Sequence, residues 1–150
     1  MSTTVDFTTV TNSIAALNIS GVTVKDVDEV TDTTKMSPAT LAPRPEDFVT
    51  GISLVPAELS QQDNDLTYTL HYRYYHCQIV RGLGGMLASY SGLITKAAAI
   101  LLAFSNDATL TGATNNTAPQ IENIGPVNDP AGNVYLGFEI SIQILQFLKV

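Results

Sequence analysis

Residues 66–78, LTYTLHYRYYHCQ, contain both histidines and the only cysteine of the 150-residue chain. Imidazole and thiolate groups bind zinc and take part in nucleophilic catalysis, so this segment is where chemistry would be expected first. Alternate residues of a regular strand share a face, which places His71 and His76 on opposite faces. His71 and Cys77 share a face but lie roughly 20 Å apart along the strand. Neither pair can meet at one ion, so we predict no metal site and no catalytic residue here.

The same alternation predicts a strand with two different faces. Tyrosines and leucines alternate on one face, while the other carries His71, Arg73 and Tyr75. Such a strand can pack against its own core on one side and meet a neighbour on the other. We therefore predict that His71, Arg73 and Tyr75 lie at a subunit contact.

Other motifs do not indicate an enzyme. RGLGGML has Leu87 where a dinucleotide-binding fingerprint needs glycine, and it lacks the Gly-Lys-Ser/Thr of a phosphate-binding loop. ASYSGL does not have the spacing of a nucleophile elbow. The acidic residues of DVDE and PED fit a solvated surface better than the paired carboxylates of a glycosidase. We predict that the protein is not an enzyme and needs no cofactor.

The composition is poor in charge. Only 14% of residues are charged, whereas the surface of a soluble domain usually carries about 25–35%. Either the chain is a threonine-rich monomer, or part of its surface is covered by neighbours. The net charge of −7 and the seven scattered basic residues argue against specific binding of nucleic acid, which needs clustered Lys and Arg.

The N-terminal sequence MSTTVDFTTV has no basic region followed by an apolar run, so it does not predict a signal peptide. The apolar stretch KAAAILLAF is far short of the about 20 residues of a membrane span. We expect a protein made in the cytoplasm, with no membrane contact.

Hydrophobic spacing predicts two helices. The first covers about residues 4–18 and the second about residues 86–104. The first has a stripe of Phe7, Val10, Ile14 and Leu17, and the apolar positions of the second are Leu87, Tyr90, Ile94, Ala97, Leu101 and Phe104.

Alternating apolar residues predict the strands. We expect a short strand around Val22 and Val24, a strand that starts near Phe48 and ends at Pro56, and its hairpin partner over about 66–80. Residues 107–120 are expected to form an exposed loop. Two C-terminal strands follow, the last with Leu136, Phe138, Ile140, Ile142 and Ile144 on one face.

Residues 31–47 are expected to form a long, stiffened loop. Pro38, Pro43 and Pro45 restrict the backbone and remove amide donors. Loops of this length in small domains are usually functional or flexible. The functional form would be an arm that contacts a neighbouring subunit, with Pro38, Leu41, Pro43, Arg44 and Pro45 as its interface residues.

These elements predict one α+β domain over residues 1–150, an antiparallel or mixed β-sheet with two helices packed on one face. Their order, with ATLAPRPEDF before the hairpin and TYTLHYRYYH within it, resembles the tail terminator (tail completion) proteins of long-tailed bacteriophages. The resemblance covers most of the chain in architecture. GLGG and the TLTGATNNTAPQ insertion have no match in it.

The resemblance implies a structural protein of the virion tail or neck. It would form a homohexameric ring that terminates the tail tube and joins the head-side connector, with DNA passing through without specific binding. An acidic lumen would repel the phosphates of that DNA. The acidic residues predicted to face it are Asp26, Asp28, Glu29 and Asp32.

Two alternatives stay open. One is another neck protein, either a head-completion protein or a stopper. The other is a small-ligand-binding α+β domain with its pocket between the sheet and the helix at 86–104.

Overall fold

The computed structural model describes residues 7–31, 33–56, 64–79, 83–114 and 116–148. Within these ranges, three α-helices and one 3-10 helix accompany the strands: α1 (Phe7–Ala15), η1 (Val27–Glu29), α2 (Pro45–Thr50) and α3 (Leu83–Asn106). The strands are β1 (Thr23–Val24), β2 (Thr40–Pro43), β3 (Leu54–Pro56), β4 (Asn64–Gln78), β5 (Asn116–Asn128) and β6 (Val134–Leu148).

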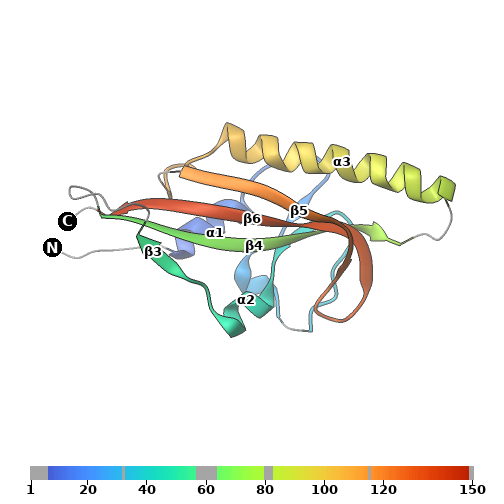
Figure 1. The fold of residues 1–150 in the computed structure, drawn as a ribbon, viewed down its shortest axis with the longest axis horizontal. Coiled ribbons are helices and arrows are strands. Elements are labelled where there is room, and N and C mark those ends of the chain that lie inside the picture. Colours follow the sequence, from blue (N-terminus) through green and yellow to red (C-terminus); the bar gives the residue numbers. More distant parts are fainter. Residues whose placement is uncertain (1–6, 32, 57–63, 80–82, 115, 149–150) are drawn as a thin grey trace.

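The strands form one mixed sheet in the order β1-β2-β4-β6-β5 (Figure 1). Among the described strands, only β1 and β2 pair in parallel. The long antiparallel pair of β4 and β6 is the centre of the sheet. On its other side, β4 pairs with β3 over Leu66–Tyr68 and with β2 over Tyr72–Tyr75. The predicted α+β class and the mixed sheet are confirmed.

Both main helices pack on one face of the sheet, as predicted. Tyr68, Leu70, Tyr72 and Tyr74 of β4 lie opposite the isoleucines and Phe138 of β6, and all of these side chains are buried. Val10 and Ile14 of α1 join the same core, as do four residues of α3: Leu93, Ala97, Ile100 and Phe104. We call this side of the sheet the helix face and the other side the open face.

The expected loop over 31–47 is wrong in its second half. Thr40–Pro43 form β2, which is buried in the sheet, and a helix begins at Pro45. Pro45 at the first helical position, followed by Glu46 and Asp47, is a favourable helix start because proline needs no amide partner there and acids complement the helix dipole. The strand expected from Phe48 is therefore limited to β3, since α2 runs to Thr50 and Gly51 ends it with φ 94°.

The expected exposed loop over 107–120 is also shorter than predicted. Residues 107–114 form turns, but β5 begins at Asn116 and pairs with β6 from Leu145 onward. Leu110 is fully buried although it has a positive φ of 50°. The polar composition of this segment hid a strand because β5 lies at the sheet edge, where alternate residues face solvent.

A second, smaller core lies on the open face. It consists of Met36, Ala42, Tyr75, Val127 and Tyr135. Met36 is held there by the turn after β5, since its amide donates to Asp129 Oδ2 (3.1 Å) and its carbonyl accepts from Tyr135 Oη (2.6 Å). The segment between η1 and β2 thus covers one end of the open face.

Candidate functional site

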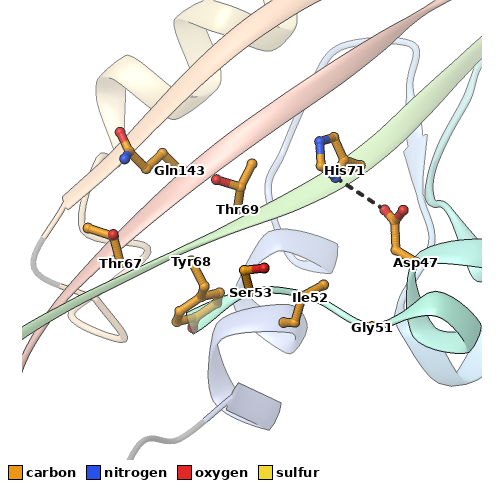
Figure 2. A pocket seen from close by; sticks show the side chains of 9 residues that line it. All are labelled: Asp47, Gly51, Ile52, Ser53, Thr67, Tyr68, Thr69, His71 and Gln143. Carbon is orange, nitrogen blue, oxygen red and sulfur yellow. Dashed lines mark ion pairs between the residues drawn. The ribbon is translucent and has the colours of Figure 1, made fainter. Parts of the chain in front are cut away.

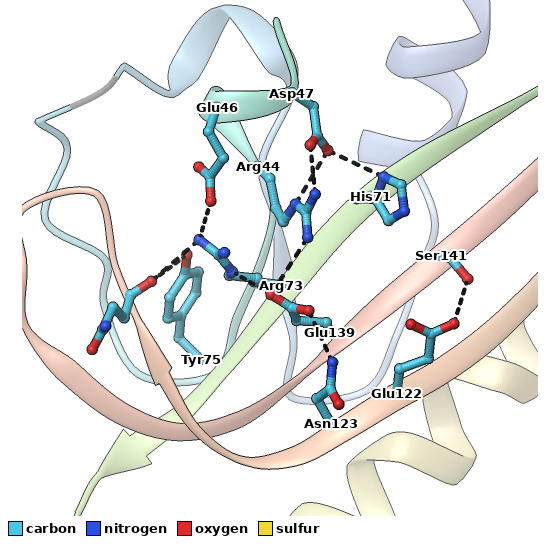
Figure 3. Close-up of polar contacts among 11 residues, drawn as sticks. Arg44, Glu46, Asp47, His71, Arg73, Tyr75, Glu122, Asn123, Glu139 and Ser141 are labelled. Atoms are coloured by element: carbon cyan, nitrogen blue, oxygen red, sulfur yellow. Dashed lines mark hydrogen bonds and ion pairs between the residues drawn. The ribbon is translucent and has the colours of Figure 1, made fainter. Parts of the chain in front are cut away.

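The uncovered part of the open face carries a network of ion pairs (Figure 3). Arg44, between β2 and α2, donates to both oxygens of Asp47, with Nη2 2.6 Å from Oδ1 and Nε 3.2 Å from Oδ2. Asp47 Oδ2 also lies 3.3 Å from Nδ1 of His71 on β4. The backbone is joined at the same place, because the Arg44 amide donates to the His71 carbonyl (3.0 Å).

Arg73 and Glu139 form the second half of the network. Arg73 Nε donates to Glu139 Oε1 (3.0 Å), and its Nη1 lies 2.6 Å from Glu46 Oε1 of α2. Glu139 also accepts from Asn123 Nδ2 (3.2 Å) and lies 3.5 Å from Arg44 Nη1. Residues of α2, β4, β5 and β6 are therefore joined into one ion-paired surface.

The pairing changes the acidity of these groups. The side-chain hydrogen bond with Asp47 raises the pKa of Arg44 against the opposing effect of burial. Burial acts to raise the pKa of Glu139, but its bonds with Arg73 and Asn123 hold that pKa below the ordinary value. Both residues are therefore held in their charged forms, and the surface is a set of compensated charges.

A hollow of about 320 Å³ lies beside the network (Figure 2). Asp47 and residues 51–53 form one wall, and β4 and β6 contribute Thr67, Tyr68, Thr69, His71 and Gln143. Hydroxyl, amide and imidazole groups thus converge there with one carboxylate. Its lining comes from α2, residues 51–53, β4 and β6 and includes no residue of α3, whereas the ligand-binding alternative expected a pocket between the sheet and that helix.

Asp47 is shared between two partners. Arg44 donates to both of its carboxylate oxygens, and its Oδ2 also contacts His71 Nδ1. Among the residues that the structure describes, no group of three or more His, Cys, Asp or Glu side chains could hold a metal ion.

The structure separates the predicted interface residues into two groups. Pro38 is exposed and Pro45 is half-buried, while the half-buried Arg44, His71 and Arg73 belong to the ion-pair network of the open face. In contrast, Leu41 and Tyr75 are fully buried in the two cores of their own chain, and Pro43 is buried in β2. In this chain Leu41, Pro43 and Tyr75 therefore offer little side-chain surface to a neighbour, and their place at a subunit contact stays a prediction.

The predicted lumen-facing acids lie around η1. Asp28 and Glu29 are exposed, but Asp26 is half-buried and caps the 3-10 helix, with its Oδ1 accepting from the Val27 amide (2.7 Å). Glu29 completes the cap by accepting from the Asp26 amide (2.9 Å). Asp26 and Glu29 thus have a local structural role, while Asp32 lies outside the described residues.

A β-bulge corrects the predicted orientation of Cys77. The pairing of β4 with β6 shifts between Tyr75 and Cys77, so that Cys77 lies opposite Leu136 and packs against the core of the helix face. His71 and Cys77 are therefore on opposite faces. The side chain of His76 lies on the side of the helices, with its Nδ1 3.1 Å from Tyr74 Oη.

The sequence pattern did not identify the outer face of α3 as an exposed apolar surface. Helical spacing grouped Leu87, Ile94 and Leu101 with the other apolar residues of this helix, but they are 75%, 51% and 37% exposed. Tyr90, Ala97 and Phe104 pack against the core as expected. The seven-residue spacing of the three exposed residues is the signal that could have shown a second apolar stripe.

Residues Leu87–Asn106 of α3 have a mean hydropathy of 1.6 and are long and apolar enough to cross a membrane. This corrects the expectation that no stretch reaches that length. One such helix is weak evidence for a membrane span, because core helices of soluble proteins pass the same test; here 22% of the span is buried, with four residues of α3 in the core.

In comparisons with known proteins, the chain matches no family model, no curated protein and no solved structure.

Proposed function

We propose that the protein is a structural subunit of the neck of a long-tailed bacteriophage. In this proposal it forms a ring, expected to be hexameric, that terminates the tail tube and meets the head-side connector. DNA passes through the ring without specific binding.

One observation carries the proposal: the two segments on which the resemblance rests lie side by side. ATLAPRPEDF contains β2 and most of α2, TYTLHYRYYH is most of β4, and β2 pairs with β4 from Thr40–Tyr75 to Pro43–Tyr72. Together these segments contribute Arg44, Glu46, Asp47, His71 and Arg73 to the open face. Residues 39–48 and 67–76 thus contribute to one surface.

This surface has the properties of a protein contact. Its charges are already paired within the chain, so a neighbour could cover it without leaving a charge unpaired. Next to it, Ile52 and Leu54 are 39% and 55% exposed. A head-to-tail ring requires two different complementary surfaces on each subunit, and the open face is our candidate for one of them.

The acidic balance supports the proposed passage of DNA. With a net charge of −7, a lumen lined by acids such as Asp28 and Glu29 would repel phosphates.

Assembly can be tested by native mass spectrometry and negative-stain imaging, with and without polymerised tail tube. We expect a closed ring for the unchanged protein and a lower ring yield for Ile52→Asp and Leu54→Asp. Val134→Asp is the matched control, because Val134 is 48% exposed on a different hairpin. A strict monomer in the presence of tail tube would overturn the proposal.

Deletion of residues 36–45 is not a suitable test of an arm. It would remove β2 from the sheet together with Met36 and Ala42 of the second core. Pro38→Gly is more informative, because Pro38 is exposed and precedes the strand. If an arm contributes to assembly, this variant should form fewer rings at unchanged thermal stability.

The hollow of about 320 Å³ favours a second candidate, the binding of a small polar molecule. Its volume lies at the lower end of the about 300–1,000 Å³ that ligand pockets occupy. A thermal-shift screen of small polar molecules would support this candidate if a compound stabilised the unchanged protein but not Thr69→Val. Support for ligand binding in place of the ring would also require that the unchanged protein forms no ring.

A further inference from the structure

We propose that the outer face of α3 binds the same face of a second copy, as an antiparallel helix pair with two-fold symmetry. The six residues of this face, which we call the α3 stripe, are all exposed: Leu87, Ser91, Ile94, Ala98, Leu101 and Ser105. They recur at alternating intervals of four and three residues, which is the spacing of a coiled-coil seam.

The α3 stripe carries no charge although the chain has a net charge of −7. The only charged side chain of α3 is Lys96, whose Nζ donates to the carbonyl of Ser20 (2.8 Å) and is thus occupied within its own chain. Two copies can therefore approach through this face without bringing like charges together or burying an unpaired one.

Large and small residues alternate along the stripe, and this alternation selects the direction of the pair. In an antiparallel pair centred near residue 96, each large residue lies opposite a small one: Leu87 opposite Ser105, Leu101 opposite Ser91, and Ile94 opposite Ala98. Each layer then contains a similar total side-chain volume, so the two helices can approach closely along their whole length. A parallel pair would place leucine on leucine and serine on serine, with alternate crowding and gaps.

The expected contact is small. The stripe covers about 19 residues, or about 28 Å of helix with a width of about 10 Å. A stable interface usually buries about 800 Å² on each partner, and Leu102, which is 59% exposed beside the stripe, adds only part of the difference. We therefore expect a reversible dimer that depends on protein concentration.

The pair does not depend on the proposed ring. A two-fold contact uses the same patch on both copies, whereas a ring uses two different patches. Helix α3 covers the helix face of the sheet (Figure 1), and the residues of the α3 stripe are exposed on its outer side, so their pairing leaves the open face available for head-to-tail contacts.

Cysteine crosslinking tests the register. In a Cys77→Ser background, Ile94→Cys and Ala98→Cys proteins are prepared separately, one of them isotope-labelled, and then mixed under mild oxidation. A disulfide needs Cα atoms about 4.4–6.8 Å apart, so we expect mixed 94–98 dimers at several-fold higher yield than homodimers of Ile94→Cys. Mixing Ile94→Cys with Ser105→Cys is the matched control and should crosslink poorly. Preferential homodimers of Ile94→Cys would overturn the antiparallel pair.

Sedimentation velocity across a range of concentrations tests the contact itself. The unchanged protein should shift from monomer to dimer, while Ile94→Asp and Leu87→Asp should lose the shift and keep the circular-dichroism spectrum. Val134→Asp is the control and should dimerise normally. Absence of a dimer, or co-flotation of the unchanged protein with phosphatidylcholine–phosphatidylglycerol vesicles, would overturn the proposal, the latter by assigning the stripe to a membrane. A ring that persists in Ile94→Asp would separate this outcome from that of the proposed function.

Discussion

Two tyrosines on the same face of β4 differ in what their hydroxyl groups contact. Tyr68 Oη donates to Gln146 Oε1 (3.2 Å), whereas the buried hydroxyl of Tyr72 has no hydrogen-bond partner among the described residues. Burial raises the pKa of Tyr68 to about 12, and burial also raises that of Tyr72. The ring of Tyr72 therefore stabilises the fold by packing, while its buried hydroxyl group lowers the free energy of unfolding.

This difference predicts opposite results for two matched substitutions. Tyr68→Phe should lower the free energy of unfolding by about 1 kcal/mol, because it removes a hydrogen bond and leaves Gln146 without that partner. Tyr72→Phe should be neutral or stabilising, since it removes a buried hydroxyl that nothing satisfies. Chemical denaturation of both variants measures the difference. A loss in Tyr72→Phe as large as that in Tyr68→Phe would mean that this hydroxyl has a partner, such as a bound water.

At the scale of elements, the close pairing of β4 and β6 at the bulge depends on one glycine. Gly137 lies opposite Tyr75, and a Cβ atom at this position would overlap the carbonyl oxygen of Tyr74 and crowd Val127. The backbones of β4 and β6 can approach this closely only because residue 137 has no side chain. The bulge in turn places Tyr75 in the open-face core and Cys77 on the helix face.

We therefore expect Gly137→Ala to be strongly destabilising. The overlap involves backbone that cannot move without breaking the central strand pair, so the loss should reach or exceed about 3 kcal/mol. Gly132→Ala is the control: its φ of 90° disfavours alanine, but nothing lies within 4 Å of the added Cβ. That strain should cost about 1–2 kcal/mol. Thermal unfolding of both variants checks the order, and equal losses would contradict the steric explanation.

At the scale of the whole molecule, stability should depend on pH through groups on both sides of the sheet. Burial, and then the charge of Lys96, lowers the pKa of His76 from 6.5. Burial acts to raise the pKa of Asp129, but hydrogen bonds from Met36 and Asn133 hold it below 3.8. The pKa of Glu139 is likewise held below 4.5 by Arg73 and Asn123, against the effect of burial.

All three shifts predict that acid destabilises the fold. A group with a lowered pKa binds protons more readily in the unfolded chain, so its contribution is present above the ordinary pKa and is lost as pH falls. The melting temperature should decline first below pH 6.5 through His76, and again below about pH 4.5 through Glu139 and Asp129. His76→Gln should remove only the first decline. A melting temperature that rises from pH 7 to pH 5 would contradict this assignment.

Local patterns in the sequence were sufficient for the long elements. The alternation of Leu136 to Ile144 determined β6 and its buried face, and the helical stripe of Phe7, Val10 and Ile14 determined α1. Both succeed because burial of apolar side chains follows the period of the backbone. The α+β class followed from the order of these elements.

Only the tertiary structure decided how the surfaces are used. Spacing alone did not show that Leu41 and Tyr75 are buried in their own chain, that a bulge turns Cys77 to the helix face, or that Leu87 points away from it. These outcomes depend on contacts between distant segments, such as Arg44 with Glu139 and Met36 with Asp129. The sequence by itself determined which residues alternate or recur. The packing of one element on another decided which of the two resulting faces is buried, because a periodic pattern defines both faces but not the partner of either.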